Sequence, residues 1–432
     1  MRLRKRCIIS ICVLGLLFQG CVAGGGGDEE EVKQKEPGIV TRTEVTQAGP
    51  YKYSVYLENS GSLNGYLNVS GDGSFRDAVY SLITGINGFR EKQTLNLYDV
   101  NTVVIPVAQN ADAAQVNDYI SNLDAATFKK RSEASGGNQA KSDLRDVFRK
   151  VLDSTAGNTV SLLISDCIFS PEGGDALNYL SQQKAGIQGF FQEKLAREPF
   201  ATLVLQFSSG FSGAYYYQDN TPITASFTSR PHYITCVGPE QALRDLLGFV
   251  EEKFQSKGYR NFLFLTPQKS YNVHPAIIMN TAYYNYEPDK PMVITDPQQG
   301  GADGRFRIKL KAGFSELPVR EAYLLDRANY ECTPGYTVES IKAQRNEQGS
   351  GSTHEIILVS AKPVSGNVSL ALNTRLPDWV GATNLDADKG LAPEALEGKT
   401  FGMRYLVSGM YDAYYTRESK PQYFTISITV KD

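Results

Sequence analysis

The feature that most constrains the fold is an alternation of strand-like and helix-like segments between Pro50 and about Pro267. Short apolar runs rich in β-branched and aromatic residues predict strands, and apolar residues at helical spacing predict helices between them. The predicted strands are 53–57, a hairpin within 94–107, 159–165, 201–207, 232–237 and 261–265; the predicted helices are 74–89, 144–152, 175–196 and 239–256. This pattern favours an α/β fold over residues 50–267, with a doubly wound, mostly parallel sheet.

The second half of the chain, residues 268–432, has a different pattern. Short alternating runs such as "RFRIKLKAGF", "EIILVSAKP", "FGMRYLVSGM" and "YFTISITVKD" are separated by turn-rich stretches. No long amphipathic helix is predicted there. We therefore expect an all-β, antiparallel sandwich domain.

The N-terminus has the layout of an export signal. Four basic residues precede a short apolar run that ends before Gly20 and Cys21, as in a secretory signal. Residues 1–20 resemble a bacterial lipoprotein signal peptide, which implies that Cys21 carries lipid; a plain signal peptide cut nearby is the alternative. Residues 21–49, with four consecutive glycines and an acidic run, predict a flexible tether. The tether also resembles the surface-export tag of Bacteroidetes lipoproteins. The alternative is that the acidic run is simply a solvated, flexible linker.

Charge and cysteine content limit the classes of partner. Loss of residues 1–20 would change the formal net charge from −3 to −7, and a mildly acidic body without a basic run argues against nucleic acid as a partner. Cys167, Cys236 and Cys332 have no metal-ligand spacing. They are expected to be buried apolar residues, or one pair could form a disulfide.

Oxygen-bearing side chains follow two of the predicted strands. Glu58, Ser60 and Ser62 stand at alternate positions after the first strand, and Asp166 follows strand 159–165. Between them, "SGGNQAKSDL" (135–144) is a Gly-rich turn that opens a helix. Carboxylate, hydroxyl and amide oxygens suit hard cations such as Mg²⁺, Mn²⁺ or Ca²⁺. Ligands in such sheets lie beyond the carboxyl ends of the strands, so we expect these groups to converge there.

The order of these loops resembles von Willebrand factor type A domains, which carry a metal-ion-dependent adhesion site. The first loop reads Glu58-Asn59-Ser60-Gly61-Ser62, and the third reads Ile164-Ser165-Asp166-Cys167, with Cys167 where glycine is usual. In the second loop Asn138 stands where the family has threonine, and Ser142 is an alternative hydroxyl. The resemblance implies that Glu58, Ser60, Ser62, Asn138 and Asp166 hold a divalent cation, whose shell an acidic side chain of a protein partner completes. The competing interpretation is a type A scaffold whose site has decayed.

Tyrosines are candidates for partner contact. In "GFSGAYYYQDN", Tyr215, Tyr216 and Tyr217 are consecutive, so that at least one would be exposed in an extended strand. Aromatic residues with a polar tip are enriched at interfaces, whereas tyrosines also fill half-buried strands. With Trp379 as the single tryptophan, a carbohydrate platform is the weaker expectation.

The sequence therefore predicts a binding protein and not an enzyme. Ser60 lacks the Gly-x-Ser-x-Gly elbow, because Glu58 occupies the first glycine position. We expect a lipid-anchored outer-membrane lipoprotein of the bacterial cell envelope, periplasmic or surface-exposed, that engages a protein ligand. The alternatives are a structural or assembly component with a metal-free site and, more weakly supported, a hydrolase.

Overall fold

The computed structural model of the 432-residue chain describes ten stretches, which are residues 50–68, 72–88, 93–141, 143–171, 175–268, 270–279, 282–287, 289–344, 351–415 and 420–432. The predicted signal peptide, the tether and Cys21 lie outside the described residues, as does Ser142. No helix among the described residues combines the length and the apolar character needed to cross a membrane.

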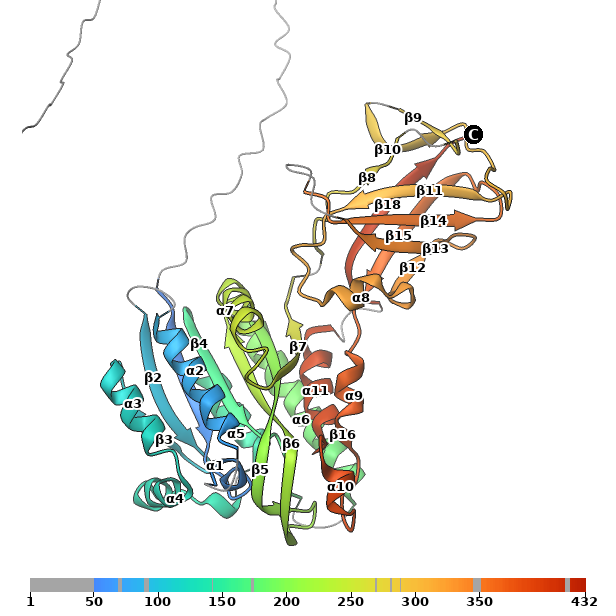
Figure 1. Ribbon diagram of the computed structural model, residues 1–432. Helices are drawn as coiled ribbons and strands as arrows, with labels where there is room; N and C mark the ends of the chain where they lie inside the picture. Colours follow the sequence, from blue (N-terminus) through green and yellow to red (C-terminus); the bar gives the residue numbers. More distant parts are fainter. Residues whose placement is uncertain are drawn as a thin grey trace, which may run out of the picture. The chain divides into compact units, whose positions relative to one another are not determined.

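A seven-stranded sheet forms the centre of the first half (Figure 1). Its strands in chain order are β1 (Lys52–Glu58), β2 (Thr94–Val100), β3 (Val104–Ala108), β4 (Thr159–Ser165), β5 (Ala201–Tyr216), β6 (Pro222–Gly238) and β7 (Tyr259–Leu265). Across the sheet they lie in the order β3-β2-β1-β4-β6-β5-β7. The predicted strands are all present, but β5 and β6 are much longer than the sequence pattern indicated.

The sheet is mixed, and only its centre is parallel. Strand β1 pairs in parallel with both β2 and β4. The other pairs are antiparallel, since β3 returns along β2 and β6 runs against both β4 and β5, with β7 against β5. The long β5–β6 hairpin places β6 beside β4. The doubly wound, mostly parallel arrangement is therefore wrong for the β6-β5-β7 half, although the mixed α/β class is confirmed.

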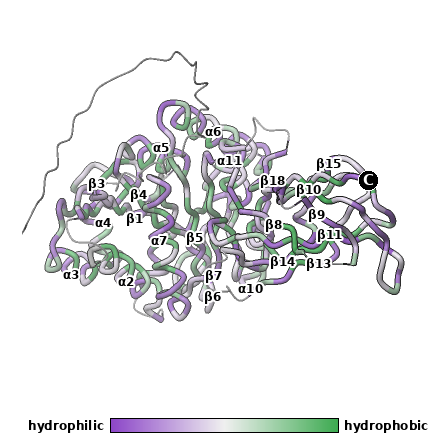
Figure 2. Tube along the Cα trace, turned by 90° about the horizontal axis from the view of Figure 1, so that it is seen from above, coloured by the Kyte–Doolittle hydropathy of each residue, from purple (hydrophilic) through white to green (hydrophobic). Residues whose placement is uncertain are grey.

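Helices cover both faces of this sheet. The helices of the first half are α1 (Asn64–Leu67), α2 (Ser74–Gly88), α3 (Ala113–Ser121), α4 (Ala125–Ala134), α5 (Leu144–Asp153), α6 (Ala176–Arg197) and α7 (Glu240–Lys253). Helices α2, α3 and α7 share one hydrophobic cluster with the sheet, and α5 and α6 share another. Figure 1 shows α2 and α7 in front of the sheet and α6 behind it. In Figure 2 the hydrophobic stretches are concentrated along the central strands.

Alternation of side chains in β1 explains why the sheet has two cores. Val55 and Leu57 belong to the first cluster, whereas Tyr56 belongs to the second, as the two-residue period of a strand requires. At α5 the chain turns into a helix because Asp143 accepts hydrogen bonds from the backbone N–H groups of Arg145 and Asp146, which is an N-cap.

The second half contains two sheets around one apolar cluster. One sheet has the order β12-β15-β18-β10-β9 and the other β13-β14-β11-β8. Their strands are β8 (Ala276–Ile277), β9 (Asn285–Glu287), β10 (Lys290–Thr295), β11 (Phe306–Ala312), β12 (Tyr330–Cys332), β13 (Thr337–Ala343), β14 (His354–Ser360), β15 (Gly366–Asn373) and β18 (Gln422–Val430). Within these two sheets the pairings are antiparallel except that β10 and β18 run in parallel.

The prediction of an all-strand second half is wrong between β15 and β18. This insertion holds α9 (Asp378–Ala382), β16 (Asn384–Leu385), α10 (Pro393–Leu396), β17 (Thr400–Phe401) and α11 (Met403–Tyr415), and α8 (Glu321–Leu325) lies before β12. The run "FGMRYLVSGM", which was predicted as a strand, forms mainly α11. Met403, Leu406 and Met410 join the cluster of α5 and α6, so the chain returns from the second half to complete the core of the first.

Candidate functional site

The first loop and the third loop meet at the carboxyl ends of β1 and β4. In the parallel register Leu57 lies opposite Ile164, which places Glu58 beside Ser165. The Ser165 hydroxyl donates a hydrogen bond to Glu58 Oε2 and itself accepts one from the backbone N–H of Cys167 at 2.8 Å. Glu58 is 4% exposed. Ser165 was not singled out in the sequence, although the parallel pairing of the two strands would have indicated it.

The two serines of the first loop lie at a cleft of about 470 Å³. The Oγ atoms of Ser60 and Ser62 are 3.1 Å apart. Glu58, Ser60 and Ser62 line the cleft, together with Lys129 from α4 and Gln139 from the second loop. Hydroxyl and carboxylate oxygens from the first loop are therefore gathered at one opening.

Asp166 is a buried carboxylate next to this cleft. It is 1% exposed, and its Oδ2 accepts no hydrogen bond within the described part of the chain. Burial raises the pKa of the Asp166 carboxyl, while the charge of Arg230 and a hydrogen bond from Ser62 act in the opposite direction. A buried oxygen without a partner is costly, so that a bound cation or a ligand donor would stabilise it.

The residue after Asp166 has an unusual backbone conformation. Cys167 has a φ of 54°, in the left-handed region that glycine adopts without cost. The loop thus keeps the backbone conformation of a glycine with a side chain that disfavours it, and such strain often lies at functional sites.

The second loop presents a different residue from the one predicted. Asn138 is exposed, its Oδ1 accepts the N–H of Ala140 at 2.9 Å, and it does not line the cleft. The neighbouring Gln139 lines the cleft instead, and its Nε2 donates a hydrogen bond to Asn59 Oδ1. The proposed Asn138 ligand is therefore not supported by its position. The 3-10 turn at Gln139–Lys141 determines which side chain faces the cleft.

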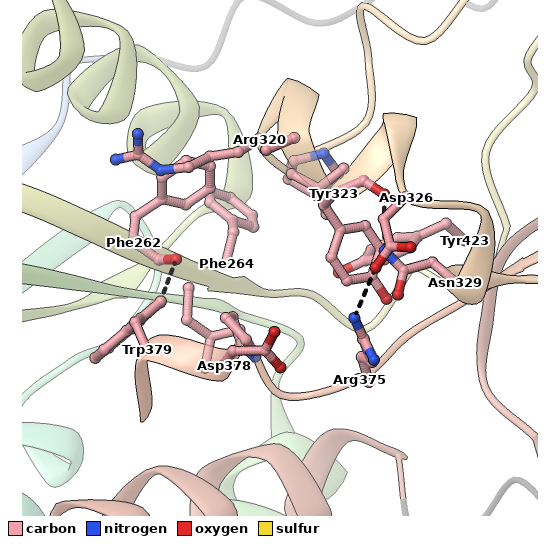
Figure 3. A pocket seen from close by; sticks show the side chains of 15 residues that line it. Phe262, Phe264, Arg320, Tyr323, Asp326, Asn329, Arg375, Asp378, Trp379 and Tyr423 are labelled. Carbon is pink, nitrogen blue, oxygen red and sulfur yellow. Dashed lines mark hydrogen bonds and ion pairs between the residues drawn. The ribbon is translucent and has the colours of Figure 1, made fainter. Parts of the chain in front are cut away.

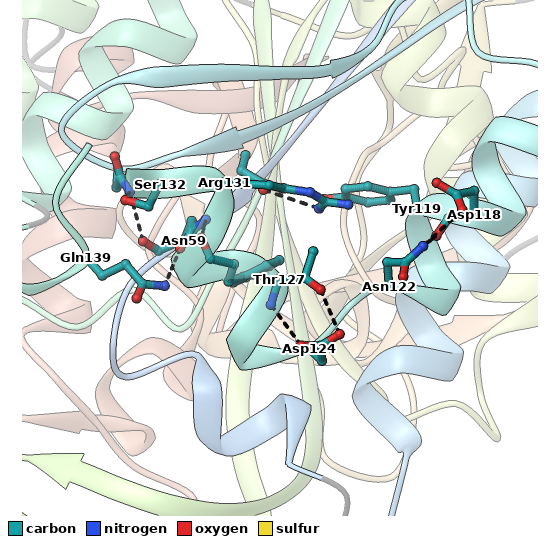
Figure 4. A network of polar contacts seen from close by, with 12 residues as sticks. Asn59, Asp118, Tyr119, Asn122, Asp124, Thr127, Arg131, Ser132 and Gln139 are labelled. Atoms are coloured by element: carbon teal, nitrogen blue, oxygen red, sulfur yellow. Dashed lines mark hydrogen bonds and ion pairs between the residues drawn. The ribbon is translucent and has the colours of Figure 1, made fainter. Parts of the chain in front are cut away.

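Hydrogen bonds connect the first loop and the neighbouring Asn101 to α4 and to the second loop (Figure 4). Asn59 Nδ2 donates to Phe128 O in α4 at 3.0 Å, and Asn101 Nδ2 donates to Ser132 Oγ at 2.9 Å. The backbone N–H of Gly61 donates to Gln139 O at 3.3 Å. Asn59 and Asn101 are completely buried. These protein contacts therefore contribute to the shape of the cleft.

Arg230 on β6 places a positive charge beneath the site. Its side chain is 2% exposed, and its guanidinium carbon lies 4.8, 4.6 and 5.5 Å from the ring centres of Phe211, Tyr215 and Phe227. Nε and Nη1 have no hydrogen-bond partner in the described part of the chain. Arg230 lies in the long β5–β6 hairpin, and the sequence pattern did not single it out.

The tyrosine run of β5 is largely engaged within the protein. Tyr215 is 1% exposed and donates a hydrogen bond to Asp388 Oδ2 at 2.5 Å, and the Tyr217 hydroxyl donates to Leu391 O at 2.7 Å. Tyr215 is therefore not available for partner contact. Tyr216 lines the cleft and is half-buried, so that it is the member of the run able to touch a ligand there.

The donor set fits a hard cation in part. Within the described ranges no three His, Cys, Asp or Glu side chains form a group that could hold a metal, so a cation here would depend on two carboxylates and the serine hydroxyls. Cys167, Cys236 and Cys332 are free thiols. The unpartnered Asp166 oxygen favours a cation, whereas the Glu58–Ser165 hydrogen bond and the charge of Arg230 oppose it.

Comparisons with known proteins identify no relative: no family model, no curated protein and no solved structure matches the chain.

Proposed function

We propose that this chain is a lipid-anchored binding protein of the bacterial cell envelope that engages an acidic group of a protein partner at the cleft beyond β1 and β4. The observation that carries this proposal is the gathering of Glu58, Ser60 and Ser62 at one cleft beside Asp166, whose Oδ2 has no partner in the described residues. The loop order similar to that of type A domains and the glycine-like backbone of Cys167 add support.

In this proposal Ser60, Ser62 and Asp166 hold a divalent cation, with Glu58 acting directly or through water. The cation would supply the positive charge that attracts a carboxylate from the partner. Other contacts of the chain shape the cation site and its opening. The Asn59–Gln139 contact keeps the loops in place, the hydroxyls of Ser60 and Ser62 offer oxygens 3.1 Å apart, and Tyr216 borders the opening.

Cation binding can be tested without the partner. A ligand that binds the folded but not the unfolded chain raises the free energy of unfolding by about 2.7 kcal/mol when its concentration is a hundred times its Kd. We expect Mn²⁺ or Mg²⁺ to raise the melting temperature of the full chain and a chelator to reverse the effect. Asp166→Asn should abolish the shift, while Asp388→Asn, which also alters a completely buried carboxylate, should retain it. Folding of each variant is checked by circular dichroism.

A metal-free structural or assembly component is the second candidate, and Arg230 is the observation that favours it. Its buried guanidinium already acts on the Asp166 carboxylate, and the loops are held by hydrogen bonds. In that case no divalent cation would shift the melting temperature, and a chelator would not disturb partner binding. A melting temperature independent of Mn²⁺, Mg²⁺ and Ca²⁺ would therefore exclude the first candidate in favour of the second.

A further inference from the structure

A second pocket lies beside the edge strand β7 and shares no lining residue with the cleft (Figure 3). Its volume is about 210 Å³, and five aromatic side chains line it. These are Phe262 and Phe264 from β7, Tyr323 from α8, Trp379 from α9, and Tyr423 from β18. A concave, mostly aromatic site with a few polar groups is the usual form of a small-molecule pocket.

The aromatic walls are held in place by contacts of their own. Trp379 Nε1 donates to Phe262 O at 3.3 Å, and the Tyr323 hydroxyl donates to Asn373 O at 2.6 Å. Tyr323 and Tyr423 form a T-shaped pair with ring centres 6.2 Å apart. Because these bonds do not involve a ligand, the pocket is preformed, which lowers the cost of ordering side chains on binding.

Two buried polar atoms of the residues that line the pocket, Asn329 Oδ1 and Arg320 Nε, have no hydrogen-bond partner among the described residues. Asn329 is 2% exposed, and its Nδ2 donates to Tyr323 O at 2.7 Å, but its Oδ1 accepts no hydrogen bond within the described residues. An unmet buried acceptor costs about 1–3 kcal/mol. A ligand N–H that reached this oxygen would remove that cost.

Charged groups of both signs line the same pocket. Arg375 forms an ion pair with Asp326 at 3.2 Å, and its guanidinium lies 5.8 Å from the ring centre of Tyr323. Asp378 is the second carboxylate in the lining. Figure 3 draws Arg375 and Asp378 below the rings of Phe264 and Tyr323. The polar side of the pocket can thus receive a cationic group and an anionic group together.

We propose that this pocket binds an aromatic α-amino acid, either free or as the C-terminal residue of a peptide. The ring lies among the five aromatic side chains, the carboxylate pairs with Arg375, and the N–H donors reach Asn329 Oδ1 and Asp378. A volume of about 210 Å³ is below the range of roughly 300–1,000 Å³ usual for drug-sized ligands and suits a single residue. This proposal does not depend on the cation site.

Calorimetric titration of the full chain with simple probes tests the proposal. We expect saturable binding of L-phenylalanine or L-tryptophan. Benzoate, phenethylamine and L-leucine should each bind at least about tenfold more weakly, because each lacks one charged group or the ring. The dipeptide Gly-Phe distinguishes the two sources: binding tighter than that of phenylalanine indicates a peptide terminus, and weaker binding indicates the free amino acid.

Variants separate a binding role from a structural one. Arg375→Gln should raise the Kd for phenylalanine about tenfold and leave the Kd for phenethylamine unchanged, since that probe has no carboxylate. The matched control is Arg404→Gln, because Arg404 forms a similarly exposed ion pair with Asp386 at 3.0 Å and does not line the pocket. Ala322→Phe, at an exposed lining position, should block all the probes. The proposal is wrong if no aromatic probe saturates, or if neither Arg375→Gln nor Ala322→Phe changes binding.

Discussion

The polar cleft and the aromatic pocket are built in opposite ways. The acidic and hydroxyl groups of the cleft follow the ends of two adjacent parallel strands. The aromatic pocket takes its walls from segments around residues 262–264, 318–329 and 375–379 and from Tyr423. The polar cleft therefore depends on the register of two neighbouring strands. The aromatic pocket depends on a chain that leaves the first half and later returns to it.

The two regions also differ in which contacts stabilise the fold and in where their polar groups are buried. Asp166 follows β4, Arg230 and His232 lie on the neighbouring strand β6, and each of these buried residues has a side-chain atom without a hydrogen-bond partner among the described residues. In the aromatic pocket, Arg375 and Asp378 are exposed to solvent, and the buried surface is mostly aromatic. We therefore expect acid sensitivity to arise near the cleft, and packing energy to be concentrated at the aromatic pocket.

The largest expected effect is the acid sensitivity that His232 confers. Its ring lies 4.8 Å from that of Phe75 and 5.5 Å from that of Phe207, and burial lowers its pKa from 6.5 to about 3. As the pH drops below 6.5, this histidine is therefore protonated in the unfolded chain before it is protonated in the folded chain, so that the free energy of unfolding falls. The loss at pH 4 is on the order of 3 kcal/mol.

His232→Leu should remove this part of the pH dependence, whatever it does to packing. The free energy of unfolding in urea is measured from pH 7 to pH 4 for both proteins. His274→Leu, at an exposed position, is the control and should keep the original slope. An equal slope in His232→Leu and the unaltered protein would show that the acid sensitivity arises elsewhere.

A pair of substitutions compares the packing energy of the two regions directly. Trp379→Ala removes a half-buried ring and its hydrogen bond to Phe262 O, and should cost about 2 kcal/mol, below the 3–5 kcal/mol of a fully buried ring. Ser62→Ala should cost about 1 kcal/mol, because it removes the hydroxyl that bonds Ser60 and the Asp166 carboxylate, while the open cleft lets water replace part of the loss.

Urea unfolding followed by circular dichroism measures both variants, since Trp379 is the only tryptophan and fluorescence would be lost. A larger cost for Ser62→Ala than for Trp379→Ala would contradict the comparison, because the cleft would then be the region that stabilises the fold.

The sequence predicted most helices and strands of the first half. It did not predict how the strands β5, β6 and β7 are placed in the sheet. Helix α5 was recognisable because Leu144, Val147 and Val151 stand at helical spacing. The placement of β6 between β4 and β5 could not be predicted, because it depends on the length of the β5–β6 hairpin and not on residue type. Helix α11 was missed because tyrosines and glycine within Met403–Tyr415 are typical of strands and turns.

At the site, the sequence indicated the polar groups that follow β1 and β4. It did not indicate which side chain of the second loop faces the cleft. Register fixes Glu58 beside Ser165, so strand ends can be predicted from a parallel sheet. A single turn decides between Asn138 and Gln139, and loop geometry of that kind is not encoded in a periodic pattern. The aromatic pocket depends on the return of the chain through α9, for which the sequence offered no signal.

A last pair of substitutions, with small expected effects, tests that return of the chain through α11. A Cβ on Gly409 would lie 2.7 Å from Lys184 O in α6, so Gly409→Ala must push the two helices apart, at a cost of about 1–3 kcal/mol. The better helix propensity of alanine returns up to about 1 kcal/mol, which leaves a net loss of about 1 kcal/mol. In α6 itself, Gly189 has no atom within 4 Å of such a Cβ, so that Gly189→Ala should stabilise the protein. Opposite signs in urea unfolding would confirm that α11 packs closely on α6, whereas a gain in both variants would show that the close contact between the helices does not exist in solution.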